Sequence, residues 1–194
     1  MNLPNILTFM RVLLTFATAV LLFVDIQYFA AAAFAVYFIA GISDWFDGYI
    51  ARKYNIVTTI GKFMDALSDK IMIVTMFMTL FALNLYHNWT AFALFCAVVS
   101  MAREFYISGI RMIASKKGAV IAAETVGKYK AAFQMYSVGA IICAYALQRD
   151  FGLIGSPLYN FAFYTGVATL GVSTLLSIIS ALSYSVKYSH LLKE

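Results

Sequence analysis

Four aspartates lie close together in a chain that is 63% hydrophobic and only 12% charged. On helices, the carboxylates of each pair would share one face, about one turn apart. Carboxylates so placed repel one another. In addition, inserting one ionised carboxylate into a bilayer costs a free energy of roughly 2.5–3.5 kcal/mol on insertion scales. The pattern therefore predicts a site that binds metal ions. The segment reads Asp44-x2-Asp47-Gly48-x2-Ala51-Arg52-x8-Gly61-x3-Asp65-x3-Asp69.

Hard divalent cations such as Mg2+ or Mn2+ prefer oxygen ligands and keep coordination positions for water and substrate phosphates. Two such ions held near each other can clamp a phosphoryl group during its transfer. We predict two ions, with Asp44, Asp47 and Asp65 as principal ligands. Asp69, one turn further along, is predicted to take the proton of an attacking hydroxyl and to be able to contact a metal. Arg52 would neutralise a phosphate by bidentate contact.

Small residues accompany the aspartates. At Gly48, Ala51 and Gly61 a larger side chain would block a ligand that lies against the backbone. A plainer interpretation stays open, because aspartates near helix ends often cap them or pair with neighbours such as Lys62 and Lys70. Four aspartates at two matched spacings favour the metal site.

The composition is that of an integral membrane protein. Mean hydropathy is +0.84 over 194 residues, and the apolar runs approach the ~20 residues that cross a bilayer as a helix. We expect an all-α bundle of six transmembrane helices that forms one domain over residues 1–194. The predicted spans are residues 10–24, 28–51, 62–86, 89–113, 120–148 and 160–186.

A narrow apolar stripe precedes the first span. It consists of Leu3, Ile6, Leu7 and Met10 at i, i+3, i+4 and i+7, and it begins beside Pro4, which suits the first turn of a helix. We expect a short N-terminal helix that lies in the membrane interface. The same residues could instead be the start of the first span.

The cations predict the orientation in the membrane. Of the 14 lysines and arginines, only Arg149 falls in a break assigned to the far side. The positive-inside bias then puts both termini and the aspartates at the cytoplasmic face of the inner membrane. The net charge of +5 suits a surface that meets anionic lipids and phosphate-bearing substrates. No basic stretch stands apart from the spans, so we expect no nucleic-acid partner.

The aspartate segment also resembles a known family. It contains Asp44-Trp-Phe-Asp47-Gly48-Tyr-Ile-Ala51-Arg52 and then Gly61-Lys-Phe-Met-Asp65-Ala-Leu-Ser-Asp69. This resembles the full signature of the CDP-alcohol phosphatidyltransferases. The resemblance implies a six-helix membrane enzyme, commonly a homodimer, that displaces CMP from a CDP-linked lipid with an alcohol.

The same resemblance implies roles for individual residues. Asp44, Asp47 and Asp65 would carry the divalent metals, and Asp69 would be the general base with metal contact. The implied CDP-lipid contacts are Asn5, Thr8, Asp44, Gly48, Ala51, Arg52, Thr58 and Gly61.

Three cations point to a phosphate on the incoming alcohol. Arg103 and Arg111 are eight positions apart, so both can project from one side of the fourth span. Lys128 begins the cytoplasmic part of the fifth span. Together they could bind a phosphate. The alternative is that these cations are ordinary flanking residues of the positive-inside bias.

Further segments resemble the bacterial phosphatidylglycerophosphate synthases, from Asn2 to about Gln134, with a departure at Ala131, where threonine is usual. This likeness implies transfer from CDP-diacylglycerol to sn-glycerol 3-phosphate, with the glycerol phosphate held by Arg103, Arg111 and Lys128. The matching segments are Asn2-Leu3-Pro4-Asn5-Ile6-Leu7-Thr8 with Arg11, Ala102-Arg103-Glu104-Phe105 through Ser108-Gly109-Ile110-Arg111, and Val120-Ile121-Ala122-Ala123 with Gly127-Lys128-Tyr129-Lys130.

Two kinds of alternative remain open. Within the family, a cardiolipin synthase would accept phosphatidylglycerol, and a phosphatidylinositol-phosphate or phosphatidylserine synthase another head group. From another class, an ion or proton transporter could keep intramembrane aspartates as a relay. A relay would not need Gly48, Ala51, Arg52 and Gly61 at set intervals, and its carboxylates should continue towards the far side of the membrane.

Overall fold

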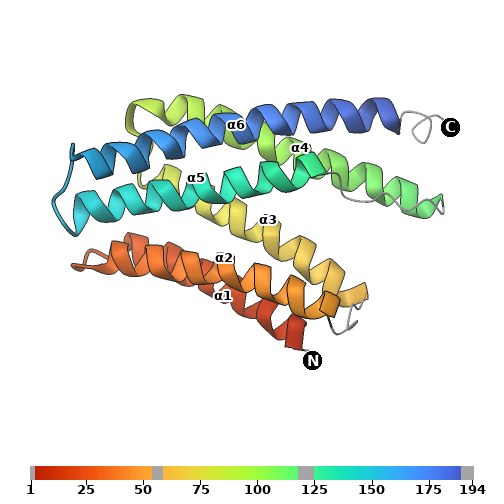
Figure 1. Cartoon of the computed structure of the whole chain (residues 1–194), viewed down its shortest axis with the longest axis horizontal. Helices are drawn as coiled ribbons and strands as arrows, with labels where there is room; N and C mark the ends of the chain where they lie inside the picture. Colours follow the sequence, from red (N-terminus) through yellow and green to blue (C-terminus); the bar gives the residue numbers. More distant parts are fainter. Residues whose placement is uncertain (1–2, 54–58, 118–124, 189–194) are drawn as a thin grey trace. The chain divides into compact units, whose positions relative to one another are not determined.

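A computed structural model of the chain describes residues 3–53, 59–117 and 125–188, with side chains except at residues 3–5, 7, 44–53, 59–60 and 62. All regular structure within these ranges is helical (Figure 1), which confirms the predicted all-α class. The helices are α1 (Leu3–Phe23), α2 (Phe29–Lys53), α3 (Thr59–Ala82), α4 (Thr90–Lys116), α5 (Thr125–Arg149) and α6 (Pro157–Lys187), with a short 3-10 helix η1 (His87–Trp89) before α4.

The first helix corrects one expectation. α1 runs without a break from Leu3 to Phe23, so the prediction of a separate N-terminal interfacial helix is wrong. The apolar stripe forms the first turns of the same helix that contains the first predicted span. No glycine or proline follows Pro4 within α1, and a helix propagates by one hydrogen bond per residue until something interrupts it.

α1 turns its polar side chains inward. Thr8, Arg11, Thr15, Thr18 and Leu22 recur at heptad spacing, and none of them is more than 4% exposed. α1 packs against α2 and α3, so these side chains meet neighbouring helices. A helix in a membrane protein is expected to turn its apolar side chains outward to the lipid and its polar side chains inward to other helices. Among the side chains that the structure describes, the large exposed apolar residues of α1 are Ile6, Phe9, Met10, Leu13, Phe16, Val20 and Phe23.

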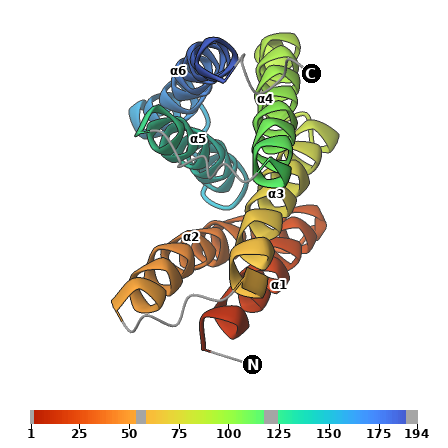
Figure 2. The same cartoon turned by 90° about the vertical axis from the view of Figure 1, so that its right-hand side faces the viewer.

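The helices form two compact units, of which the first comprises Met1–Leu85 and Val138–Tyr164. Its helices α1, α2 and α3 can be followed in Figures 1 and 2. Arg149, at the end of α5, donates to the carbonyl of Val24 at 2.7 Å and to the carboxylate of Asp25 at 2.7 Å. The Asp150 carboxylate accepts the backbone N–H of Ala31 at 2.6 Å. These contacts satisfy backbone groups that helix ends leave without partners.

The second unit comprises Tyr86–Ser137 and Thr165–Glu194. It holds α4, the first part of α5 and most of α6. α6 carries buried hydroxyl groups along its length. Those of Ser173, Thr174 and Ser177 donate to carbonyls about one turn earlier in the same helix. Such local bonds satisfy hydroxyl groups in an apolar setting. Ser137 of α5 donates to the carbonyl of Gly166 at 2.7 Å, which joins α5 to α6.

The surface and the helix lengths are those of a membrane protein. Within the part of the chain that the structure describes, three helices are long and apolar enough to cross a membrane: His87–Lys116, Thr125–Arg149 and Pro157–Lys187. Each of the six α-helices also exposes large apolar side chains, which a water-facing surface avoids in such number. Among these are Phe16, Phe38, Met78, Phe95, Phe133 and Leu175. That all six helices cross the bilayer stays a prediction.

Candidate functional site

All four aspartates lie on helices, as their spacing predicts. Asp44 and Asp47 are near the end of α2, and Asp65 and Asp69 are near the start of α3. Several predicted contacts lie outside the part that the structure describes in full, so the convergence of the four carboxylates stays a prediction. These positions are Asn5, Asp44, Asp47, Gly48, Ala51, Arg52 and Thr58.

Asp65 and Asp69 converge on one arginine of α1. Arg11 donates from Nη2 to Asp65 Oδ1 at 3.1 Å and from Nη1 to Asp69 Oδ1 at 2.6 Å. The Arg11 side chain is 0% exposed, whereas those of Asp65 and Asp69 are 53% and 59% exposed. The guanidinium therefore holds the two carboxylates from the buried side, and both stay accessible from the other.

The sequence carries a signal for Arg11 that the spacing of the aspartates does not contain. The arginine that pairs with both aspartates comes from another helix, 54 positions from Asp65 and 58 from Asp69. Arg11 lies in a row with Thr8, Thr15 and Thr18, all buried in a helix whose other residues, apart from Asn5, are apolar. A polar row of this kind marks the face of a membrane helix that meets protein.

The described carboxylates fit a divalent cation but do not complete a site. Carboxylate oxygens are the ligands that Mg2+ prefers in proteins, and Asp65 and Asp69 point to the same place, because one guanidinium contacts both. Among the side chains that the structure describes, no three acidic, histidine or cysteine residues gather in a way that would hold a metal. That Asp44 and Asp47, near the end of α2, complete the ligand set stays a prediction.

Two other predicted contacts have described surroundings. Thr8 is buried in α1, one turn before Arg11, and Gly61 is half-buried in the first turn of α3, one turn before Asp65. Both positions therefore lie next to the ion pair.

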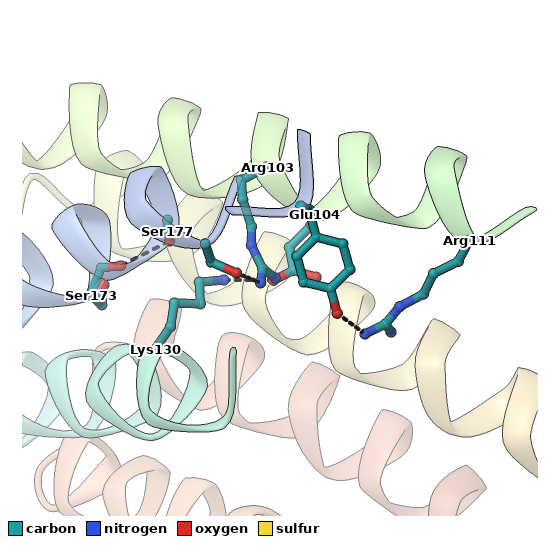
Figure 3. Close-up of polar contacts among 8 residues, drawn as sticks. Arg103, Glu104, Arg111, Lys130, Ser173 and Ser177 are labelled. Carbon is teal, nitrogen blue, oxygen red and sulfur yellow. Dashed lines mark hydrogen bonds and ion pairs between the residues drawn. The ribbon is translucent and has the colours of Figure 1, made fainter. Parts of the chain in front are cut away.

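Arg103 and Arg111 share one side of α4, as their spacing predicts. Arg103 Nη2 donates to Ser180 Oγ at 2.6 Å, and Arg111 Nη2 donates to the hydroxyl of Tyr184 at 3.0 Å. Both acceptors lie on α6, one turn apart. Figure 3 shows the side chains of both arginines extending from α4, with Arg103 beside Glu104 and Lys130 and with Arg111 further along the helix.

Lys130 forms a polar cluster with Glu104 and Arg103. The spacing of the cations along the sequence did not predict Lys130 as a site residue. Its Nζ lies 2.7 Å from Glu104 Oε1, and the same oxygen accepts a bond from Arg103 Nη1 at 3.0 Å (Figure 3). The side chains of Lys130 and Arg103 are only 3% and 10% exposed. Among the side chains that the structure describes, these two largely buried cations share one carboxylate, which leaves one excess positive charge there. Because buried charge needs compensation, the cluster favours an anionic ligand.

Lys128 and Lys130 differ in environment because they are two positions apart on a helix and so lie on different faces. Lys128 is exposed, whereas Lys130 is buried. The start of α5 nevertheless lies close to Arg103, since a Cβ at Gly127 would be 3.3 Å from Arg103 Nη2. Helical periodicity could have separated the two lysines, but the partner of Lys130, Glu104, lies 26 positions away.

Comparison with known proteins gives consistent matches. A family model described as CDP-alcohol phosphatidyltransferase matches residues 1–181. Three bacterial relatives share the name CDP-diacylglycerol–glycerol-3-phosphate 3-phosphatidyltransferase. The one from Bacillus subtilis strain 168 is 33% identical over 132 residues, 68% of this chain and 64% of that protein. Those from Haemophilus influenzae and Escherichia coli K12 are 29% and 30% identical over 185 residues, 94% of this chain and 91% and 92% of the relatives.

Proposed function

Because this chain belongs to the CDP-alcohol phosphatidyltransferase family, we propose that it transfers a phosphatidyl group from CDP-diacylglycerol to sn-glycerol 3-phosphate, giving phosphatidylglycerophosphate and CMP. The names of the three relatives support this donor and this acceptor. One structural observation carries the choice of a phosphorylated alcohol. It is the cluster of Arg103, Glu104 and Lys130, whose described side chains carry one excess positive charge.

The aspartates are proposed to hold the metal. Asp44, Asp47 and Asp65 would bind two divalent ions, Mg2+ or Mn2+, and Asp69 would contact one of them. Ions bound there supply Lewis-acid stabilisation to the diphosphate and to the departing CMP. The support from geometry is the convergence of Asp65 and Asp69, whose carboxylates are held on one side of α3.

Asp69 is proposed to start the reaction. Its carboxylate takes the proton of the acceptor's hydroxyl, and the freed oxygen attacks the phosphorus that bears the lipid. The bond from that phosphorus to the CMP oxygen breaks, and CMP leaves with the electron pair. The CDP-lipid would be held by Arg52 and would lie against the backbone at Gly48, Ala51 and Gly61. The other proposed contacts are Asn5, Thr8, Asp44 and Thr58.

The acceptor's phosphate is proposed to lie against the cationic cluster. Arg103, Arg111 and Lys128 are the predicted contacts, and the structure adds Lys130 as a fourth candidate. Arg111 is exposed, and its guanidinium is steadied by the hydroxyl of Tyr184 at 3.0 Å. An exposed arginine held in this way can present its remaining N–H groups to a phosphate in bidentate fashion.

The setting is also part of the proposal. We place the active site at the cytoplasmic face of the inner membrane, since the positive-inside bias predicts that orientation. Anionic membrane lipids would then surround the basic ends of the helices. A homodimer is the assembly that the family resemblance implies.

An assay of the purified chain with a panel of alcohols tests the function. CDP-diacylglycerol is offered with sn-glycerol 3-phosphate, phosphatidylglycerol, inositol phosphate or serine, and both CMP and the lipid product are measured. We expect CMP release and phosphatidylglycerophosphate with glycerol 3-phosphate. Release of CMP with another alcohol, without incorporation of labelled glycerol 3-phosphate, would assign the chain to another branch of the family.

Substitution of Arg111 tests the proposed binding site for the acceptor's phosphate. Arg111→Ala should raise the KM for glycerol 3-phosphate by about 10- to 100-fold, because a hydrogen bond to a charged group contributes about 1.5–3 kcal/mol. The KM for CDP-diacylglycerol should change much less. Steady-state kinetics with each substrate varied in turn provides the measurement.

The matched control is Lys116→Ala, which removes an exposed cation from the last turn of the same helix. Lys116 serves as an ordinary flanking residue, so both KM values should stay near wild type. Equal increases in the two KM values for Arg111→Ala would contradict a role in acceptor binding.

A further inference from the structure

Arg11 occupies a place where arginine is rarely found. Its side chain is 0% exposed, although arginine is almost never fully buried unless it is paired. It lies in the middle of α1, on the face that packs against neighbouring helices. The ion pairs with Asp65 and Asp69 are the compensation that this burial requires.

The contact uses the shape of the guanidinium as well as its charge. Nη1 and Nη2 each contact a different carboxylate, and the two carboxylates lie one turn apart on α3. Both bonds are made to the Oδ1 atom, so Arg11 holds one oxygen of each carboxylate and limits the directions in which the other oxygen can point. The ammonium of a lysine is a compact point charge on a flexible stem and cannot reproduce this fork.

Arg11 lies on a buried face of α1. Thr15 Oγ1 donates to the Arg11 carbonyl at 2.8 Å, and Thr15 is buried on the same face. Thr8 lies one turn before Arg11 on that face and is buried as well. A side chain fixed in a packed helix can serve as a rigid reference for groups on another helix.

We propose that Arg11 is a positioning residue that orients Asp65 and Asp69 for divalent metal binding. The inference rests on the proposed function, in which these two carboxylates contact the metal. By fixing one oxygen of each, Arg11 turns the two carboxylates towards a common site before a cation arrives. Groups behind metal ligands commonly act in this way, and their loss costs about 10- to 100-fold in metal affinity or activity.

A role in charge balance alone predicts a different outcome. A cation beside a metal site repels the metal, so removing its charge would tighten binding of a divalent ion. Replacing arginine by lysine would then change nothing, because the charge is kept. Positioning by the fork predicts weaker metal binding in both cases, since neither lysine nor glutamine can hold the two carboxylates together.

The test measures Mn2+ binding to the full chain in detergent without substrates, by electron paramagnetic resonance of the free ion. We expect Arg11→Lys to raise the Kd for Mn2+ by about 10- to 100-fold and to lower kcat, while the KM for CDP-diacylglycerol stays near wild type. Arg149→Lys is the matched control, because it changes the arginine that pairs with Asp25 in the same unit. Its Mn2+ affinity should equal that of the wild type.

Arg11→Gln is a second variant in case Arg11→Lys does not fold, which thermal unfolding would reveal. It should also bind Mn2+ more weakly than the wild type, although it removes a positive charge. Wild-type affinity in Arg11→Lys, or tighter binding in Arg11→Gln, would overturn the inference, as would a wild-type chain that binds no Mn2+. A wild type that binds Mn2+ but releases no CMP would refute the proposed function alone.

Discussion

Asp69→Asn is expected to abolish CMP release while binding of the CDP-lipid remains measurable. Asparagine has nearly the shape of aspartate but cannot take a proton from the acceptor's hydroxyl, and general base catalysis contributes about 10²- to 10⁴-fold. Loss of metal contact at the same position adds to the effect. Radiolabelled CMP release gives turnover, and thermal stabilisation by CDP-diacylglycerol gives binding.

The control for Asp69→Asn comes from the preceding residue. Ser68 is buried on α3, and Ser68→Ala should keep turnover because this hydroxyl has no part in the proposed chemistry. The unfolding temperature of Asp69→Asn must also be recorded, since the substitution weakens the ion pair with Arg11. A folded variant with preserved turnover would remove Asp69 from its assigned role.

Removal of divalent ions is expected to have a similarly large effect. Exhaustive chelation should stop CMP release completely, because the carboxylates alone cannot stabilise the charge that develops on the diphosphate. Addition of Mg2+ or Mn2+ should restore turnover to the chelated protein. The assay is CMP release before chelation, after chelation and after readdition of the metal.

The structure adds an expectation for the metal-free protein. Arg11 compensates part of the negative charge on Asp65 and Asp69, so chelation should leave the chain folded, with a circular dichroism spectrum that is unchanged. This control separates lost catalysis from unfolding. Full turnover after complete chelation would contradict the metal proposal.

The positions of the helices could be predicted from local patterns in the sequence. Each α-helix begins and ends near a polar break of the sequence, because the interruption of an apolar run marks where a segment leaves the membrane or turns. Between α5 and α6, Gly152 and Gly155 adopt positive φ values of 65° and 75°, and Pro157 opens α6. Glycine and proline at those places fit a turn and a helix start for reasons of backbone geometry alone.

The extent of the first helix did not follow in the same way. An apolar stripe shows which residues share a face, but it does not show whether a helix stops before the next apolar run. Leu3 and Phe23 belong to one helix because nothing between them breaks the hydrogen-bonded ladder. The expectation of a separate first segment relied on the apolar stripe beside Pro4, and a stripe does not determine where a helix ends.

The grouping of the acidic side chains on one face could be predicted from the sequence, since positions three or four apart on a helix must share a face. That rule predicted the common side of Asp65 and Asp69 and of Arg103 and Arg111, and the family signature extended it to the reaction. The choice of partners depended on how the helices pack. Arg11 meets Asp65 and Asp69, and Lys130 meets Glu104, because packing brings together side chains of separate helices, and no periodicity along the chain relates residues so far apart.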